Sequence, residues 1–234
     1  MPNLINEALP GIINATIASN YLGWIQAILG LVVITNLSLL GVERHPVSIR
    51  LLALQGMLLS LLLLLPHAEF LGFYLLGATV LFFCVKGLIM PYLLGRASRT
   101  LQPQLGIRPY LGNTGCVLLG LAGFAFSIWL NSRIGLAANP LFSSIFPVAC
   151  ATIFTGFLLI VTRKEALGQI FGYLVLENGI FLLGVPMAHI DAIWLELSVL
   201  LDILAGVFVM GIAVYHIHRV FDSTYVDNFA TIRD

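Results

Sequence analysis

The feature that most constrains this chain is a succession of long apolar stretches separated by polar connections. An α-helix needs about 20 predominantly apolar residues to cross the hydrocarbon core of a bilayer. Seven stretches reach this length, at residues 21–42, 47–66, 69–94, 112–132, 140–162, 166–187 and 193–217. The sequence therefore predicts an all-α integral membrane protein with about seven transmembrane helices.

The composition agrees with this class and excludes several others. Of the 234 residues, 59% are hydrophobic and 9% are charged, whereas about 25% are charged in a soluble domain. No basic patch is present, which argues against a nucleic-acid partner. The five histidines lie in predicted loops or at a helix end, so haem is not expected. The three cysteines stand alone in apolar runs, so we expect no metal site and no cofactor: Cys84, Cys116 and Cys150.

The distribution of lysine and arginine predicts the orientation in the membrane. With seven spans, Arg133 is the single basic residue in the loops of one side, and Lys86 lies inside a span. Basic residues favour cytoplasmic loops, so the other side is predicted to be cytoplasmic. The N-terminus is then outside and the C-terminus inside. The cytoplasmic set has nine members: Arg44, Arg50, Arg96, Arg99, Arg108, Arg163, Lys164, Arg219 and Arg233.

The longest polar loop, with prolines at positions 103 and 109, divides the chain into two parts. On this basis we predict an external N-terminal segment, a three-helix unit, a cytoplasmic loop, a separate fourth helix, a second three-helix unit and a cytoplasmic tail. These segments are, in order, residues 1–20, 21–94, 95–111, 112–132, 139–219 and 220–234.

The sixth stretch carries a carboxylate, Glu177, near its middle. At about 1.5 Å per residue it lies about 17 Å from the helix start at Ala166. A charge at that depth costs a few kcal/mol and usually faces a partner or a wet cavity. Glu177 is therefore either a structural carboxylate bonded to a neighbouring helix or a proton-carrying group. We favour the second interpretation. Asn178 could hold a water or brace another helix, and simple packing explains it equally well.

The last stretch carries two more acids. Asp202 lies about 14 Å from the outer end of its predicted helix, a depth similar to that of Glu177 on the antiparallel neighbour. Two carboxylates at one level could exchange a proton through water. Glu196 precedes Asp202 by six residues and points to a different face, near the outer surface. We predict roles in proton transfer for both acids, with a solvated acid as the alternative for Glu196.

The third stretch contains Lys86, followed by Pro91, which is expected to bend the helix. A lysine at this depth is either paired with an acid, poised to exchange a proton, or extended toward the cytoplasmic side near Arg96. We include Lys86 among the proton-transfer candidates. Amides in the first two stretches are expected to form hydrogen bonds between helices: Gln26, Asn36 and Gln55.

Residues 140–219 resemble the K subunit of respiratory complex I (NuoK) and its MrpC-type relatives in multisubunit antiporters. Glu177 in LVLENGIFL matches the family's mid-membrane glutamate, and Asp202 in LLDILAGVFVMGI matches an acid of the following helix. That second acid is usually glutamate, so the aspartate is a departure from the family's pattern.

Most of the chain resembles component E of hydrogenase-4 (HyfE), through GQIFGYLVLENG, WLELSVLLD, VKGLIMPYLL and a DNF-type tail. The resemblance implies a non-catalytic, proton-translocating membrane-arm subunit of a group 4 [NiFe] hydrogenase or formate hydrogenlyase-type complex. Such a subunit has no redox centre and lies in the inner (plasma) membrane of a prokaryote. The partners implied are antiporter-like and NuoH-like subunits, a hydrogenase or other redox module, and lipid.

Two alternatives remain open, a subunit of a multisubunit Na⁺/H⁺ antiporter and a passive membrane anchor that takes part in assembly. A seven-helix retinal protein is disfavoured, because its lysine would be expected in the last helix, where this chain has Asp202 and no lysine.

Overall fold

The structure is a computed structural model that describes residues 2–64, 73–100, 112–134 and 140–187, together with Gly206 and Gly211. All regular elements in these ranges are helical. They are α1 (Pro2–Gly41), α2 (His45–Leu64), α3 (Phe73–Cys84), the π-helix η2 (Val85–Ile89), α4 (Met90–Thr100), α5 (Asn113–Ile134), α6 (Pro140–Thr162), α7 (Ala166–Gly184) and the 3₁₀ turn η4 (Val185–Met187).

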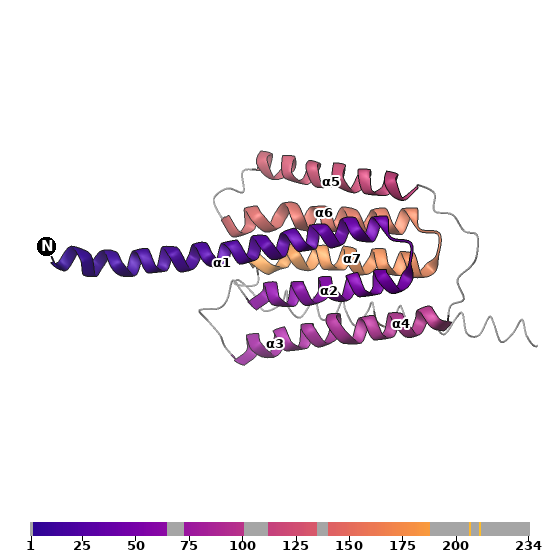
Figure 1. Cartoon of the computed structure of the whole chain (residues 1–234), viewed down its shortest axis with the longest axis horizontal. Coiled ribbons are helices and arrows are strands. Elements are labelled where there is room, and N and C mark those ends of the chain that lie inside the picture. Colours follow the sequence, from indigo (N-terminus) through magenta and orange to yellow (C-terminus); the bar gives the residue numbers. More distant parts are fainter. Residues whose placement is uncertain are drawn as a thin grey trace, which may run out of the picture.

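The helices form a bundle in which α1, α2, α6 and α7 surround the interior, with α5 on one flank and α3–η2–α4 on the other (Figure 1). α6 and α7 pack against each other along their length, while α2 contacts both α7 and the α3–η2–α4 helix. The first part of α1 projects beyond the end of the bundle (Figure 1). This arrangement brings the middle of α2, α7 and η2 together.

Six of the described helical segments are long and apolar enough to cross a membrane. They correspond to the first six stretches expected from the sequence, which confirms the all-α integral membrane class. The seventh, residues 193–217, lies outside the described residues except for Gly206 and Gly211, both of which are helical. The spans are Tyr21–Gly41, His45–Leu64, Thr79–Arg96, Asn113–Ile134, Pro140–Thr162 and Leu167–Gly184.

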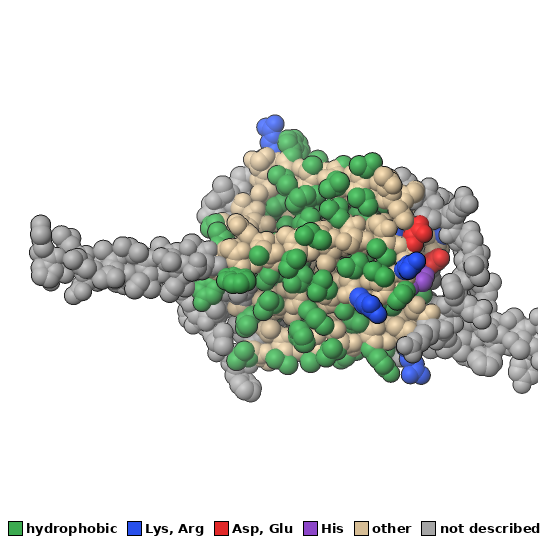
Figure 2. Space-filling view, viewed as in Figure 1, with side chains coloured by type: hydrophobic (Ala, Val, Ile, Leu, Met, Phe, Trp, Pro, Cys, Tyr) green, Lys and Arg blue, Asp and Glu red, His purple; other side chains and the backbone are tan. Residues whose placement is uncertain are grey.

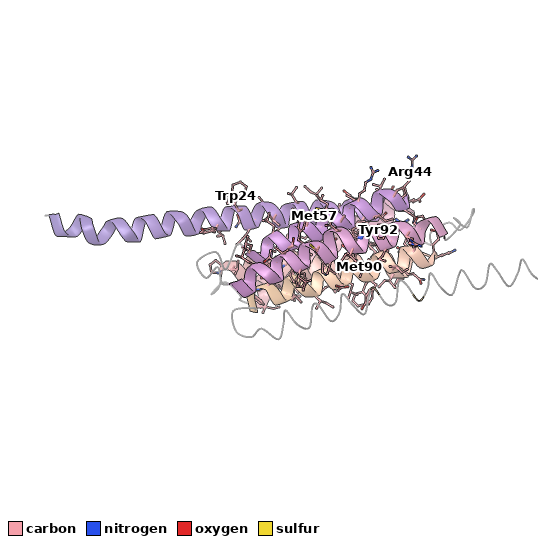
Figure 3. The ribbon with its side chains drawn as sticks, turned by 90° about the horizontal axis from the view of Figure 1, so that it is seen from below. Trp24, Arg44, Met57, Met90 and Tyr92 are labelled. Carbon is pink, nitrogen blue, oxygen red and sulfur yellow. The ribbon has the colours of Figure 1, made fainter. Side chains whose placement is uncertain are left out.

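Charge separates along the long axis of the bundle. Most charged side chains of the visible face gather at one end, and apolar side chains cover the sides between the ends (Figure 2). Trp24 and Arg44 point outward near opposite ends of the membrane-spanning part of α1 (Figure 3). Tryptophan is typical of membrane–water interfaces, and arginine of cytoplasmic loops. The orientation itself, with the N-terminus outside and the C-terminus inside, stays a prediction.

The third span is one long helix with a π-turn in its middle. The Pro91 ring lacks an N–H and crowds the carbonyl one turn earlier, so regular α-helical bonding cannot continue through it. The chain instead forms the π-helix Val85–Ile89, and the Met90 N–H donates to the Val85 carbonyl. The helix then continues to Thr100, into the range 95–111 that was expected to be a loop. Single π-turns of this kind often occur at functional sites.

Small residues allow α6 and α7 to approach closely. A Cβ added at Gly156 would lie 2.5 Å from the Leu176 nitrogen, and one at Gly172 would lie 2.7 Å from the Ile160 nitrogen. These distances are shorter than real Cβ contacts, so only glycine fits. Packing of small residues is the usual basis of close helix association in lipid. The close crossing holds α7, and with it Glu177, firmly inside the bundle.

Candidate functional site

The centre of the bundle contains an ion pair. Lys86 Nζ lies 2.8 Å from Glu177 Oε1, and the side chains are 5% and 1% exposed, respectively. Glu177 is eleven residues into α7, about 17 Å from its start, and Lys86 lies near the middle of the long third helix. Both charges are therefore far from either end of the bundle. Breaking such a pair by removing one partner costs about 3–5 kcal/mol, because the other charge is left buried.

Two features of the chain position Lys86. The π-turn contains Lys86 itself, so the residue lies on the distorted part of its helix. The facing residue on α2 is Gly56, where an added Cβ would lie only 2.8 Å from Lys86 Cβ and 3.0 Å from the Lys86 carbonyl oxygen. The absence of a side chain at Gly56 lets the two helices touch. The lysine can then extend across the interior to α7.

Two aromatic rings flank the ammonium group. Phe82 and Phe181 have ring centroids 4.8 Å apart, and Lys86 Nζ lies 6.0 Å and 5.6 Å from their respective centroids. Phe82 precedes Lys86 by one helical turn, and Phe181 follows Glu177 by one turn. A cation within about 6 Å of an aromatic face is attracted by the ring quadrupole, more strongly when it is desolvated. The rings therefore stabilise the ammonium group and exclude solvent from one side of the pair.

A chain of hydrogen bonds leads from the ion pair across the bundle. Lys86 Nζ donates to Asn178 Oδ1 at 3.0 Å, and Asn178 Nδ2 donates to Gln55 Oε1 at 3.3 Å. Gln55 Nε2 then donates to Asn36 Oδ1 at 3.0 Å, and Asn36 Nδ2 donates to Thr152 Oγ1 at 2.8 Å.

The chain ends on a backbone acceptor, since Thr152 Oγ1 donates to the Val148 carbonyl at 2.7 Å. Its four uncharged side chains are all buried and come from α7, α2, α1 and α6: Asn178, Gln55, Asn36 and Thr152. We call this set the amide chain.

A small cavity of about 20 Å³ lies beside the pair, lined by Lys86, Asn178 and apolar side chains of α2, α4 and α7. Met90 and Leu94 also line it, so it extends from Lys86 toward the end of α4 at Thr100. A buried water needs about 10–15 Å³ and two or more polar partners. The cavity thus has room for about one water molecule beside Lys86 and Asn178.

The structure brings together two of the four predicted site residues. Lys86 pairs with Glu177 and does not extend toward Arg96, so of the interpretations considered for this lysine, pairing with an acid is the one observed. Asp202 and Glu196 lie outside the described residues. Gly206, four residues after Asp202, is described, and a Cβ built on it would lie 3.7 Å from Met90 Cε. This contact places one point of the last predicted span beside α4.

Hydrogen bonds between helices were expected for Gln26, Asn36 and Gln55, and they are observed for Asn36 and Gln55. Gln26 is exposed and forms no such bond with the described residues, so for this residue the expectation is wrong. Asn178 braces α7 against α2 through Gln55. The sequence did not indicate that Asn36, Gln55 and Asn178 bond to one another and to the ion pair. Nor did it indicate that Thr152 belongs to the same set. The available signal was that each is a polar residue in the middle of an apolar span. Such residues usually face the interior of a bundle.

A second polar cluster closes the charged end of the bundle. His45 Nε2 lies 2.8 Å from Glu165 Oε2, and Arg163 donates to the Val42 carbonyl at 2.7 Å. These contacts tie the α1–α2 connection to the α6–α7 connection. The His45 and Glu165 side chains are 22% and 32% exposed, so this pair is at the rim and the Lys86–Glu177 pair is not.

Comparison with known proteins finds relatives over most of the chain. It is 31% identical over 198 residues to the uncharacterized protein Rv0085 of Mycobacterium tuberculosis, a match that covers 80% of this chain and 85% of the relative. It is 24% identical over 204 residues to hydrogenase-4 component E of Escherichia coli K12, covering 87% and 94%, with the same values for Shigella flexneri. No family model matches, and no solved structure matches significantly.

Proposed function

Because this chain belongs to the family of the mycobacterial protein Rv0085 and is homologous to hydrogenase-4 component E, we propose that it is a membrane subunit of a hydrogenase complex that carries protons through Lys86 and Glu177. The observation that carries the proposal is the ion pair at 2.8 Å, buried in the middle of the bundle. A buried charge pair is costly to build, and replacing one by apolar residues often stabilises a protein. A role in proton transfer would explain why the chain has a buried ion pair at this position.

The pair has the chemistry that a relay needs. The ammonium and carboxylate groups are in hydrogen-bond contact, so a proton can pass from Nζ to Oε1 without any movement of the helices. The cavity beside Lys86 extends toward the end of α4 that the basic residues predict to be cytoplasmic. A water molecule in this cavity would be a first step for proton exchange between Lys86 and the cytoplasmic side; the rest of that path is part of the proposal. Among the described residues, Asn178 and the rings of Phe82 and Phe181 border other sides of the ammonium group.

The next step of the relay is proposed to use Asp202, and Glu196 beyond it. Asp202 precedes Gly206 by four residues, which is about one turn or 6 Å in a helix. Since Gly206 is beside Met90, and Met90 follows Lys86 by four residues, a helical course for residues 193–217 would bring Asp202 near the level of Lys86. Glu196 would then lie closer to the outer surface, where the proton leaves.

The redox chemistry is proposed to reside in other subunits. Oxidation and reduction there would alter the hydration and charge around Lys86 and Glu177, and so drive the proton across. The partners we propose are antiporter-like and NuoH-like membrane subunits and a hydrogenase or other redox module, all at the inner (plasma) membrane of a prokaryotic cell. The complex would be of the group 4 [NiFe] hydrogenase or formate hydrogenlyase type.

The proposal is tested by redox-driven proton uptake into vesicles that contain the purified native complex. Because removing one partner also costs stability, uptake is compared at equal amounts of assembled complex. Glu177→Gln and Lys86→Met should then each lose most of the uptake, because neither replacement can bind and release a proton. Glu165→Gln is the matched control, since it makes the same chemical change at the rim. Full uptake with Glu177→Gln would overturn the proposal and favour a passive anchor. Sodium-dependent uptake would instead indicate an antiporter-type subunit.

A further inference from the structure

The amide chain is oriented, and both of its ends impose the same direction. An ammonium group can only donate, so Asn178 must turn its oxygen toward Lys86 and its nitrogen away. At the other end, the Thr152 hydroxyl donates its hydrogen to the Val148 carbonyl, which can only accept. The Thr152 oxygen in turn accepts a hydrogen bond from the Asn36 side-chain N–H. Every member therefore points the negative end of its dipole toward Lys86.

This orientation does not depend on Lys86 alone. Because the Thr152 hydroxyl donates to a backbone carbonyl of α6, the far end of the chain favours the same direction for the amides of Asn36, Gln55 and Asn178 as the ammonium group does. Hydrogen bonds in a chain polarise one another, and they act more strongly in a low-dielectric interior. Gln55 and Thr152 are fully buried and the two asparagines are 3% and 4% exposed, so water screens the chain very little.

An amide chain is a poor proton wire. To pass a proton along, each amide would have to give up an N–H proton and accept one on its oxygen, leaving an unfavourable imidic tautomer at every member. A role in conduction is therefore excluded for Asn36, Gln55 and Asn178. Besides bracing the helices, these amides can affect where the proton of the Lys86–Glu177 pair is held.

The pair has two forms that differ only in the position of one proton. In the ionised form the proton is on Lys86 Nζ and Glu177 is a carboxylate. In the neutral form the N–H bond has broken, an O–H bond has formed on Glu177, and an amine faces a carboxylic acid. No other atom or electron is exchanged. In an apolar interior the neutral form gains from losing both charges, so a specific interaction is needed to hold the ionised one.

We propose that Asn178, Gln55, Asn36 and Thr152 are positioning residues that hold the Lys86–Glu177 pair in its ionised form. This inference deepens the proposed relay, on which its functional meaning rests. The amide chain sets the resting state from which the relay starts, with the proton on the lysine at the cavity side. A change in the far helices α1 or α6 that breaks the chain would then release the proton to Glu177.

The test is infrared spectroscopy of the full-length chain in lipid vesicles, with isotope-labelled glutamate to identify glutamate bands. Wild type should show no protonated carboxyl band from Glu177 near neutral pH. Asn178→Leu, Gln55→Met and Thr152→Val replace members of the chain by side chains of similar shape without polar groups. Each should produce a protonated glutamate band, largest for Asn178→Leu at up to one group per chain, and smallest for Thr152→Val.

The matched control is Thr162→Val. The Thr162 hydroxyl is also buried and donates to its own helix, at the Leu158 carbonyl, but it is not a member of the chain. This variant should show no new band. Adding Glu177→Gln to Gln55→Met should abolish the band, which identifies its source. Thr152→Val replaces one hydroxyl by a methyl group at the far end of the chain. It is therefore the variant expected to keep the fold even if Asn178→Leu or Gln55→Met does not.

A protonated Glu177 band in wild type, or its absence from Asn178→Leu and Gln55→Met in folded protein, would overturn the inference. Equal bands in Thr152→Val and Thr162→Val would also overturn it, because the band would then not depend on membership of the amide chain. The measurement needs no redox partner, so its failure is distinct from a failure of the relay, which is read from proton uptake.

Discussion

Gly56→Ala should weaken the structure at the point where Lys86 is held. The added Cβ would lie 2.8 Å from Lys86 Cβ and 3.0 Å from its carbonyl oxygen, whereas ordinary contact begins near 3.4 Å. The two helices must therefore separate by about 0.6 Å, and the backbone of the π-turn offers no flexible end to move aside. Overpacking of this kind typically costs about 1–3 kcal/mol.

The consequence for the site is specific. A shift of about 0.6 Å applied to Lys86 is enough to lengthen its 2.8 Å contact with Glu177 and its 3.0 Å bond to Asn178 toward or beyond the usual range of a hydrogen bond. We therefore expect Gly56→Ala to lower the free energy of unfolding by about 1–3 kcal/mol and to reduce proton uptake by the complex.

The free energy of unfolding is measured on the full chain in mixed detergent micelles, with Gly30→Ala as the control. Gly30 is exposed in the middle of a span, and a Cβ there meets no described atom within 4 Å. Alanine is the better helix former by up to about 1 kcal/mol, so the control should be neutral or slightly stabilised. If the two variants lose equal stability, or if Gly56→Ala retains full uptake, the close packing does not position Lys86.

Three further outcomes are expected. Cysteine labelling from each side of the membrane should place the N-terminus outside and the C-terminus in the cytoplasm, and both termini on one side would contradict seven spans. Asp202→Asn should assemble normally and lose most proton uptake, and normal uptake would remove this residue from the relay. Glu165→Gln should lower the free energy of unfolding by no more than about 1 kcal/mol and less at high salt, because the pair with His45 is partly exposed; a loss above about 2 kcal/mol would show a larger role.

The class of fold could be predicted because lipid imposes a strong rule on sequence. Apolar stretches of about 20 residues have few other uses, and the first six coincide with described helices. The π-turn was harder to predict from the sequence. Pro91 predicts a disturbance of its helix, but the form that the disturbance takes depends on the helices packed around it.

The partner of Glu177 could not be predicted from spacing. Depth along neighbouring helices suggested Asp202, yet depth does not show which side chain lies across the interior from Glu177. That depends on the rotation of each helix, which is set by close contacts such as those at Gly56 and Gly172. The same contacts align Asn36, Gln55 and Asn178 into one chain. Each was recognisable as a polar residue at membrane depth, but their connection is a property of the packed bundle.

The central claim is that Lys86 and Glu177 act as one proton-carrying unit, and a double-variant measurement tests it most directly. Redox-driven proton uptake is compared in vesicles containing complexes with Lys86→Met, Glu177→Gln or both changes. Residues that act as a unit are strongly non-additive, so the double variant should be hardly worse than either single variant. Losses that multiply, or full uptake by Glu177→Gln, would contradict the claim.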